Sequence, residues 1–180
     1  MQAARLLALS LFFCSTFALG GGNHDVTVRG GNVKLRSSVV DAACLISLSN
    51  TDAYVQLGEW RTNQFKTVGS DSNAIPFSIQ LDECSTHIWQ AVSIRFQGIA
   101  DKHDVQVLAM TSAANTAQGI GLAIFDIHDE IMPINAEPRH VILLNRGVNT
   151  LRFFAKYRMT QPLLTPGDAS AWAAFTVIYE

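Results

Sequence analysis

The chain contains 180 residues, of which 48% are hydrophobic and 16% are charged, and its formal net charge is −2. This length corresponds to one domain. Because the charge balance is mildly acidic and the sequence contains no basic cluster, the composition argues against a nucleic-acid-binding protein, which needs a cationic surface to contact phosphates.

The first twenty residues have the features of a secretory signal peptide. Arg5 provides a short positive region, residues 6–19 form an apolar run, and Ala18 and Gly20 are small residues at the positions that a signal peptidase reads. The apolar run is short for a membrane span. We therefore expect cleavage after Gly20 and export of a mature chain with 12 basic and 15 acidic residues, a net charge of −3.

The segment 23–40 has the pattern of a strand, a kink and a second strand. Apolar residues alternate with polar ones on both sides of a glycine pair, and the pair shifts the alternation by one position. The positions are Val26, Val28, Gly30, Gly31, Val33 and Leu35. Period-two spacing predicts a strand with one buried face, and the glycine pair indicates a bulge or the close approach of another backbone. The segment can pair within its own domain or with another chain.

Two cysteines, Cys44 and Cys84, remain once Cys14 leaves with the signal peptide. An even number of cysteines in an exported protein predicts a disulfide. A thiolate metal site would need two more ligands at close spacing, and none lies near either cysteine. Closing a loop of this length constrains the unfolded chain by about 4 kcal/mol in a chain-entropy treatment.

Short apolar runs separated by turn residues occupy most of the remaining sequence. The predicted strands are 44–48, 53–57, 75–81, 88–96, 105–109, 119–126, 140–144, 149–158 and 171–179. The best helical candidate, 111–118, is rich in Asn and Thr and is predicted as a loop. Regularly spaced short strands with a disulfide predict an all-β fold, an immunoglobulin-like β-sandwich.

The last predicted strand reaches the end of the sequence. Phe175, Val177 and Tyr179 alternate with Thr176, Ile178 and Glu180. At the edge of a sheet such a strand is an exposed template for strand addition, which exported proteins seldom leave uncovered. We therefore expect either a partner that covers it or a position in the middle of its own sheet.

The sequence contains no recognisable catalytic arrangement. Its histidines show no i,i+2 or i,i+4 pairing, and it has no nucleophile elbow, phosphate loop or Cys–His arrangement. The polar runs 101–104 and 126–130 could ligate a metal, but turn tips are the commoner origin of such runs. Trp60, Trp89 and Trp172 could line a sugar site, although packing is the commoner role of tryptophan. We expect no enzyme activity, metal or cofactor.

Several motifs, taken together in their order and spacing, resemble the pilins of the chaperone–usher pathway, in the type 1 fimbrial group. They span the mature chain, and the nearest resemblance is to a minor subunit. The motifs are Val39–Cys44, Val55-Gln56-Leu57-Gly58, Pro76–Leu81 ahead of Cys84, Gly119–Ile124, Phe154-Ala155-Lys156-Tyr157, and a C-terminal segment with Gly167 and the penultimate Tyr179.

The resemblance implies an incomplete immunoglobulin-like β-sandwich, the pilin fold, which lacks its last strand and is completed by a donor strand. It divides the chain into a signal peptide (1–20), an N-terminal extension that acts as the donor strand (21–36) and a pilin domain (37–180). A periplasmic chaperone would lend the missing strand first, and the extension of the next subunit would replace it. The expected partners are thus a chaperone, an outer-membrane usher and neighbouring pilins, in the periplasm and then in the fimbrium on the cell surface.

The resemblance also assigns two sets of functional residues. The donor strand contains the alternating positions from Val26 to Leu35 given above. The chaperone-binding C-terminal segment contains Gly167, Phe175, Val177, Tyr179 and Glu180. The implied function is that of a structural, minor fimbrial subunit, which contributes to adhesion organelles or to termination of their growth.

The glycine pair leaves the register of the donor strand open, because a slip of one residue exchanges the buried face. We favour Gly31, Val33 and Leu35 as the inserted set, since it includes the larger leucine and continues toward the domain. Arg29 would then point toward the far end of the groove, where a charge weakens the donor or restricts its partners. A terminating role is our hypothesis for this feature. The alternative function is a stand-alone secreted β-sandwich that binds a glycan or a protein through a self-completed sheet.

Overall fold

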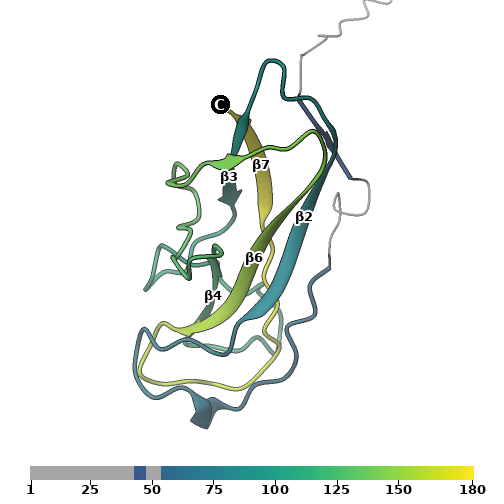
Figure 1. Ribbon diagram of the computed structural model, residues 1–180. Helices are drawn as coiled ribbons and strands as arrows, with labels where there is room; N and C mark the ends of the chain where they lie inside the picture. The colour runs from purple at the N-terminus through teal and green to yellow at the C-terminus, as the bar shows by residue number, and fades with distance from the viewer. Residues whose placement is uncertain (1–42, 48–53) are drawn as a thin grey trace, which may run out of the picture. The chain divides into compact units, whose positions relative to one another are not determined.

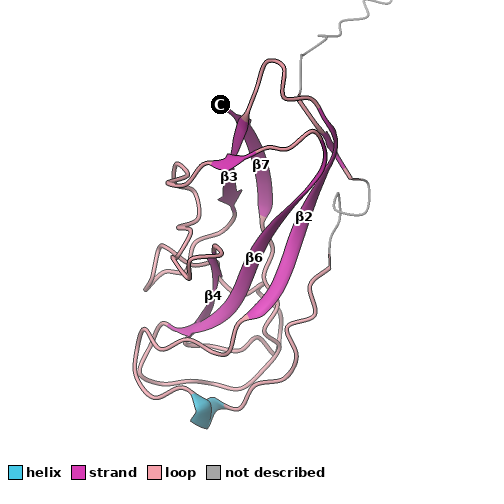
Figure 2. Ribbon diagram, in the orientation of Figure 1, coloured by secondary structure: helices cyan, strands magenta, loops and turns pink. Residues whose placement is uncertain are grey.

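The computed structural model of the protein describes residues 43–47 and 54–180, all of which belong to one compact unit, residues 40–180. Its elements are β1 (Leu45–Ile46), the 3-10 helix η2 (Thr62–Gln64), β2 (Ile75–Cys84), β3 (Ala91–Gln97), β4 (Ile120–Phe125), β5 (Ile142–Leu143), β6 (Gly147–Met159) and β7 (Ala174–Tyr179). Within these residues no helix is long and apolar enough to cross a membrane. The predicted all-β fold is confirmed (Figure 2).

The strands form two antiparallel sheets. The order in the first sheet is β1-β2-β6-β4, and the order in the second is β5-β3-β7. The long strands β2 and β6 run side by side, as Figure 1 shows, and pair from Ile75↔Ala155 to Cys84↔Gly147 with an irregularity between Leu81 and Cys84. Among the described strands, the C-terminal strand β7 lies at an edge of its sheet.

Strand β6 illustrates why the sequence forms these elements. The side chains of Asn149, Leu151 and Phe153 are buried, whereas Thr150 and Arg152 between them are exposed. Successive side chains of a strand point to opposite faces, so this alternation places one face of β6 in the core.

The main core lies between the two sheets. Phe77 on β2 and Phe153 on β6 contact Phe96 on β3, with ring centroids 6.2 and 5.3 Å away, respectively. Offset and edge-on aromatic contacts of this kind stabilise a core beyond their buried area. The three rings therefore fix the sheets against each other.

A second, smaller core covers the other face of β4. Val107, Ala123 and Phe125 are buried there, and Ile131 and Phe154 pack against them. Strand β4 is thus covered on both faces, which explains why five of its six residues are buried.

The predicted disulfide between Cys44 and Cys84 is present, with the two Cα atoms 4.0 Å apart. It joins the residue before β1 to the last residue of β2. The backbone is paired at the same place, because the Ser85 N–H donates to the carbonyl oxygen of Ala43 at 2.6 Å.

Two predicted strands are wrong. Residues 54–57 have no regular secondary structure, and 105–109 forms a turn followed by isolated bridges from Leu108 to Ala100 and Leu122. In the second case Asp101 and Asp104 accept backbone N–H bonds, including that of Gln106 to Asp104 at 3.1 Å. Aspartate side chains compete in this way with strand pairing and favour turns.

Candidate functional site: an open flank along strand β7

Strand β7 exposes part of the core. Among the described strands it pairs only with β3, in the register Phe175↔Phe96, Val177↔Ile94 and Tyr179↔Val92. The β3 members of these pairs are buried, with exposed fractions of 5%, 1% and 0%. The β7 members are only half-buried. Opposite residues of an antiparallel pair share a face, so the core is closed over β3 and partly open over β7.

The half-buried apolar surface continues upstream of β7. We call it the open flank, and its residues are Leu164, Ala169, Ala171, Ala173, Phe175, Val177 and Tyr179, all of which pack against the main core. In the described part of the chain, β7 has no strand on its outer side. Its unpaired backbone N–H and C=O groups form a template to which another strand can add.

A cavity of about 430 Å³ lies at the upstream end of the open flank. Its apolar lining includes Trp60, Phe65, Ile120 and Leu164. The hydroxyl of Tyr157 donates to the Ala169 carbonyl oxygen in the same wall. Burial raises the pKa of Tyr157, so its phenol stays protonated and remains a donor. The cavity therefore combines apolar side chains with a polar, hydrogen-bonded wall.

Gly167 lies in the wall of this cavity and has a specific packing role. A Cβ at this position would lie 2.7 Å from the backbone nitrogen of Ala117 and 2.8 Å from the carbonyl carbon of Thr116. The neighbouring Asp168 N–H donates to the Asn115 carbonyl oxygen at 2.6 Å. Gly167 is needed because the backbone of residues 115–117 passes too close for a side chain at this position. The residues next to Gly167 in the sequence do not reveal this contact.

The end of β7 is held inside the domain. The backbone N–H and C=O of Glu180 bond to Ala91 at 3.0 and 3.3 Å, and its side-chain carboxylate accepts a bond from the buried Ser93 hydroxyl at 2.6 Å. The hydroxyl of Tyr179 bonds to the backbone of Cys44. The structure therefore brings Phe175, Val177 and Tyr179 onto one face and places Gly167 at the cavity beyond it.

The predicted donor-strand residues lie outside the described residues. This applies to Val26, Val28, Gly30, Gly31, Val33 and Leu35. Their role therefore stays a prediction.

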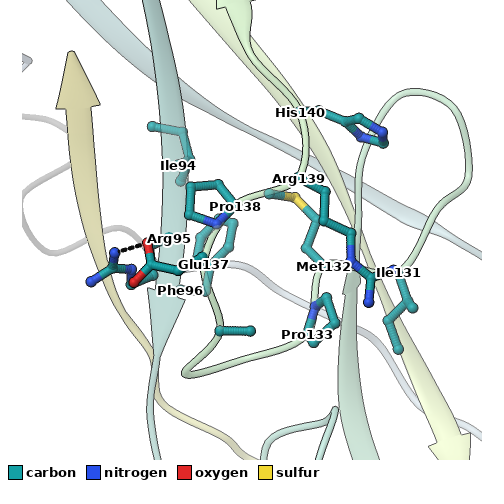
Figure 3. Close-up of a pocket in the computed structure, with 11 residues that line it drawn as sticks. Ile94, Arg95, Phe96, Ile131, Met132, Pro133, Glu137, Pro138, Arg139 and His140 are labelled. Carbon is teal, nitrogen blue, oxygen red and sulfur yellow. Dashed lines mark hydrogen bonds and ion pairs between the residues drawn. The ribbon is translucent and has the colours of Figure 1, made fainter. Parts of the chain in front are cut away.

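A second pocket, at the opposite edge of β3, is too small for a ligand. Its volume is about 20 Å³, which is close to that needed by a single water molecule. Figure 3 shows Ile94 and Phe96 in its lining, and Arg95 and Glu137 joined by an ion pair beside it.

The polar run 126–130 forms a turn after β4 and gathers histidines that are distant in sequence. Asp126 Oδ1 accepts the N–H groups of His128 and Glu130, both at 2.9 Å, and Asp126 Oδ2 lies 2.7 Å from His140 Nδ1. Burial alone would raise the pKa of Asp126, but these contacts outweigh it and lower the pKa. In the described ranges no group of His, Cys, Asp and Glu side chains is arranged to hold a metal ion.

Comparison with known proteins identifies the family. Residues 33–180 match the family described as "Fimbrial protein". The chain is 36% identical over 174 residues to a fimbrial subunit type 1 of Salmonella typhimurium, which covers 95% of this chain and 94% of the relative. It is 34% identical over 157 residues to a fimbrin-like protein, FimI, of Salmonella typhi, which covers 87% of this chain and 89% of the relative.

Solved structures agree with this assignment at the level of the fold. The P pilus rod subunit PapA superimposes with a TM-score of 0.66 at 19% identity, over 77% of this chain and all of that chain. A chaperone–usher pilus subunit superimposes with a TM-score of 0.67 at 20% identity, over 86% of this chain and 98% of that chain. The extent of the sequence match leads to one conclusion: the chain belongs to the fimbrial protein family, and its relatives include type 1 fimbrial subunits.

Proposed function

We propose that this fimbrial subunit works by strand exchange: its open flank receives a β-strand first from a periplasmic chaperone and then from the next subunit of the fibre. The observation that carries the proposal is the burial contrast across one registered strand pair. Ile94 on β3 is 1% exposed, whereas its partner Val177 on β7 is half-buried. A strand added at the outer side of β7 would cover this surface.

The energy available to such a bond is large. If an inserted strand buries four or five apolar side chains, each contributes roughly 1.5–3 kcal/mol. Each new main-chain hydrogen bond adds about 1 kcal/mol net. A bond of this strength between subunits breaks slowly, as a fibre requires.

Residues 21–36 are the proposed donor strand, with Gly31, Val33 and Leu35 inserted into a neighbouring groove. The segment 1–20 is the proposed signal peptide, which directs the chain to the periplasm. From there an outer-membrane usher would assemble the subunit into a fimbrium on the cell surface. The relatives named as type 1 fimbrial subunits support a structural role in a fibre rather than a catalytic one.

The chaperone would bind along β7, with its own edge strand beside Phe175, Val177 and Tyr179. We propose that basic residues of the chaperone hold the carboxylate of Glu180, whose side chain also bonds to Ser93.

Removal of residues 175–180 tests this assignment. We expect the truncated chain to be lost from chaperone complexes isolated from the periplasm. The matched variant Thr176→Ala changes a side chain that is exposed and outside the core, so it should co-purify normally. Because truncation can also impair folding, Val177→Asp provides a second variant with an intact main chain. If both altered chains still co-purify with chaperone, the assignment is wrong.

The place of the subunit in the fibre is a finer proposal. In the favoured register Arg29 lies on the same face of the donor as Gly31, Val33 and Leu35. A charge on this face restricts the grooves that the donor can enter, so we propose a minor subunit that limits growth of the fibre. A synthetic peptide of residues 23–36 can be titrated against a chaperone-bound sibling subunit. Slow or undetectable exchange is expected, and rapid exchange would contradict a terminating role.

A further inference from the structure

We infer that the carboxylates of Glu59 and Asp168, at the cavity end of the open flank, select a basic donor strand, and that residues 23–36 of a second copy of this chain are such a strand. The inference rests on the proposed function and adds to it the identity of one partner.

The charged side chains in the cavity lining are both acidic. Glu59 and Asp168 are the charged residues among those that line it, and both are exposed. In the described part of the chain neither forms an ion pair. Asp71 and Asp129 differ in this respect, because Arg158 and Lys156 neutralise them.

The segment that we propose to fill the flank carries the opposite charge. Residues 23–36 contain Arg29, Lys34 and Arg36 against the single acidic residue Asp25, a net charge of +2. Residues 37–180 contain 9 basic and 14 acidic residues, a net charge of −5. The net charge of residues 23–36 is thus opposite in sign to the net charge of residues 37–180.

Opposite charges at an entry site accelerate association, and salt weakens the effect by screening. The two carboxylates in the cavity lining would attract a strand with basic residues, whereas they would not accelerate the association of a neutral strand. Arg29 then has a partner in a groove of this kind and none in a groove without carboxylates. The charge that restricts the donor elsewhere therefore favours pairing between two copies of this chain.

The test is the rate at which the synthetic peptide 23–36 displaces the chaperone from the full mature chain, measured at low and high salt. We expect the rate to fall as salt rises. The double variant Glu59→Gln and Asp168→Asn should slow exchange at low salt by about 3- to 10-fold and remove the salt dependence. The peptide with Arg29→Gln, Lys34→Gln and Arg36→Gln should exchange with the wild-type chain at a similarly reduced rate. Combining this peptide with the double-variant chain should reduce the rate no further.

The controls separate this inference from the proposed function. Glu83→Gln removes an exposed carboxylate outside the cavity lining, and it should leave the rate unchanged. A peptide with Leu35→Ala should bind poorly at every salt concentration, because it removes an apolar contact. If the exchange rate does not depend on salt, or if Glu83→Gln lowers it as much as the double variant does, the charge selection is overturned but strand exchange is not. No exchange of any peptide under any condition overturns strand exchange itself.

Discussion

The phenolic oxygen of Tyr179 lies 3.2 Å from both the backbone nitrogen and the carbonyl oxygen of Cys44, a residue 135 positions away in the sequence. Because Cys44 is bonded through its sulfur to Cys84 at the end of β2, this contact ties the end of β7 to the other sheet. We call the Tyr179–Cys44 hydrogen bonds together with the Cys44–Cys84 disulfide the clasp. The clasp closes one end of the open flank, and the cavity lies at the other end.

Replacing Tyr179 with phenylalanine tests the clasp. The ring stays in the core, but the Cys44 N–H loses its acceptor. A partly buried unpaired group of this kind destabilises a protein by about 1–3 kcal/mol. Urea denaturation of the purified chain of residues 21–180 measures the loss. Tyr54→Phe is the control, since Tyr54 is 86% exposed, and an equal effect in both variants would contradict the role of the clasp.

Removing the disulfide by Cys44→Ala with Cys84→Ala should destabilise the chain by about 2–5 kcal/mol. Combining this change with Tyr179→Phe should give less than the sum of the two losses, because both act through the position of Cys44. Strict additivity in the same denaturation experiment would show that the disulfide and the hydroxyl act independently.

Gly167→Ala should destabilise the fold by about 1–3 kcal/mol, because the added methyl group would overlap backbone atoms of 115–117 that cannot move like a side chain. Gly58→Ala is the matched control. Gly58 has open space around it and a φ of +74°, so its replacement should produce only the backbone strain of about 1 kcal/mol. The prediction fails if Gly167→Ala is as mild as the control.

The lowered pKa of Asp126 predicts a dependence of stability on pH. The folded-state pKa lies below the ordinary value of 3.8, so the stabilisation is fully present above about pH 4 and is lost as the pH falls through the folded pKa. Unfolding free energies of the wild type and Asp126→Asn should differ most above about pH 4 and converge below it. A difference that stays constant across this range would contradict the assignment.

Local patterns in the sequence predicted most of the strands. Alternation around Leu151 and Phe153 marked β6, and apolar spacing from Phe175 to Tyr179 marked β7 as an edge candidate. Both signals arise from the period of two residues in a strand. By contrast, Val105 and Val107 had the same spacing, but Asp101 and Asp104 redirect the backbone into a turn, and this competition is not visible in the apolar pattern.

The parts of the site that depend on distant residues could not be predicted. Nothing near Gly167 indicates that the backbone of 115–117 passes over it, and nothing near Glu59 indicates that Asp168 lines the same cavity. His140 and Asp126 likewise meet only through the fold. Motif resemblance gave the C-terminal segment its proposed role, whereas its burial contrast with β3 required the structure.

The most direct test is to append a copy of residues 23–36, through a flexible linker, after residue 180 of a chain that contains residues 21–180. A chain that lacks a strand should be stabilised by several kcal/mol when the strand is provided, because apolar groups of the open flank become covered. An appended copy with Val33→Asp and Leu35→Asp should give little of this gain. If the intact appended strand leaves the urea midpoint of the chain unchanged, the core of this protein is already complete and strand exchange is not its function.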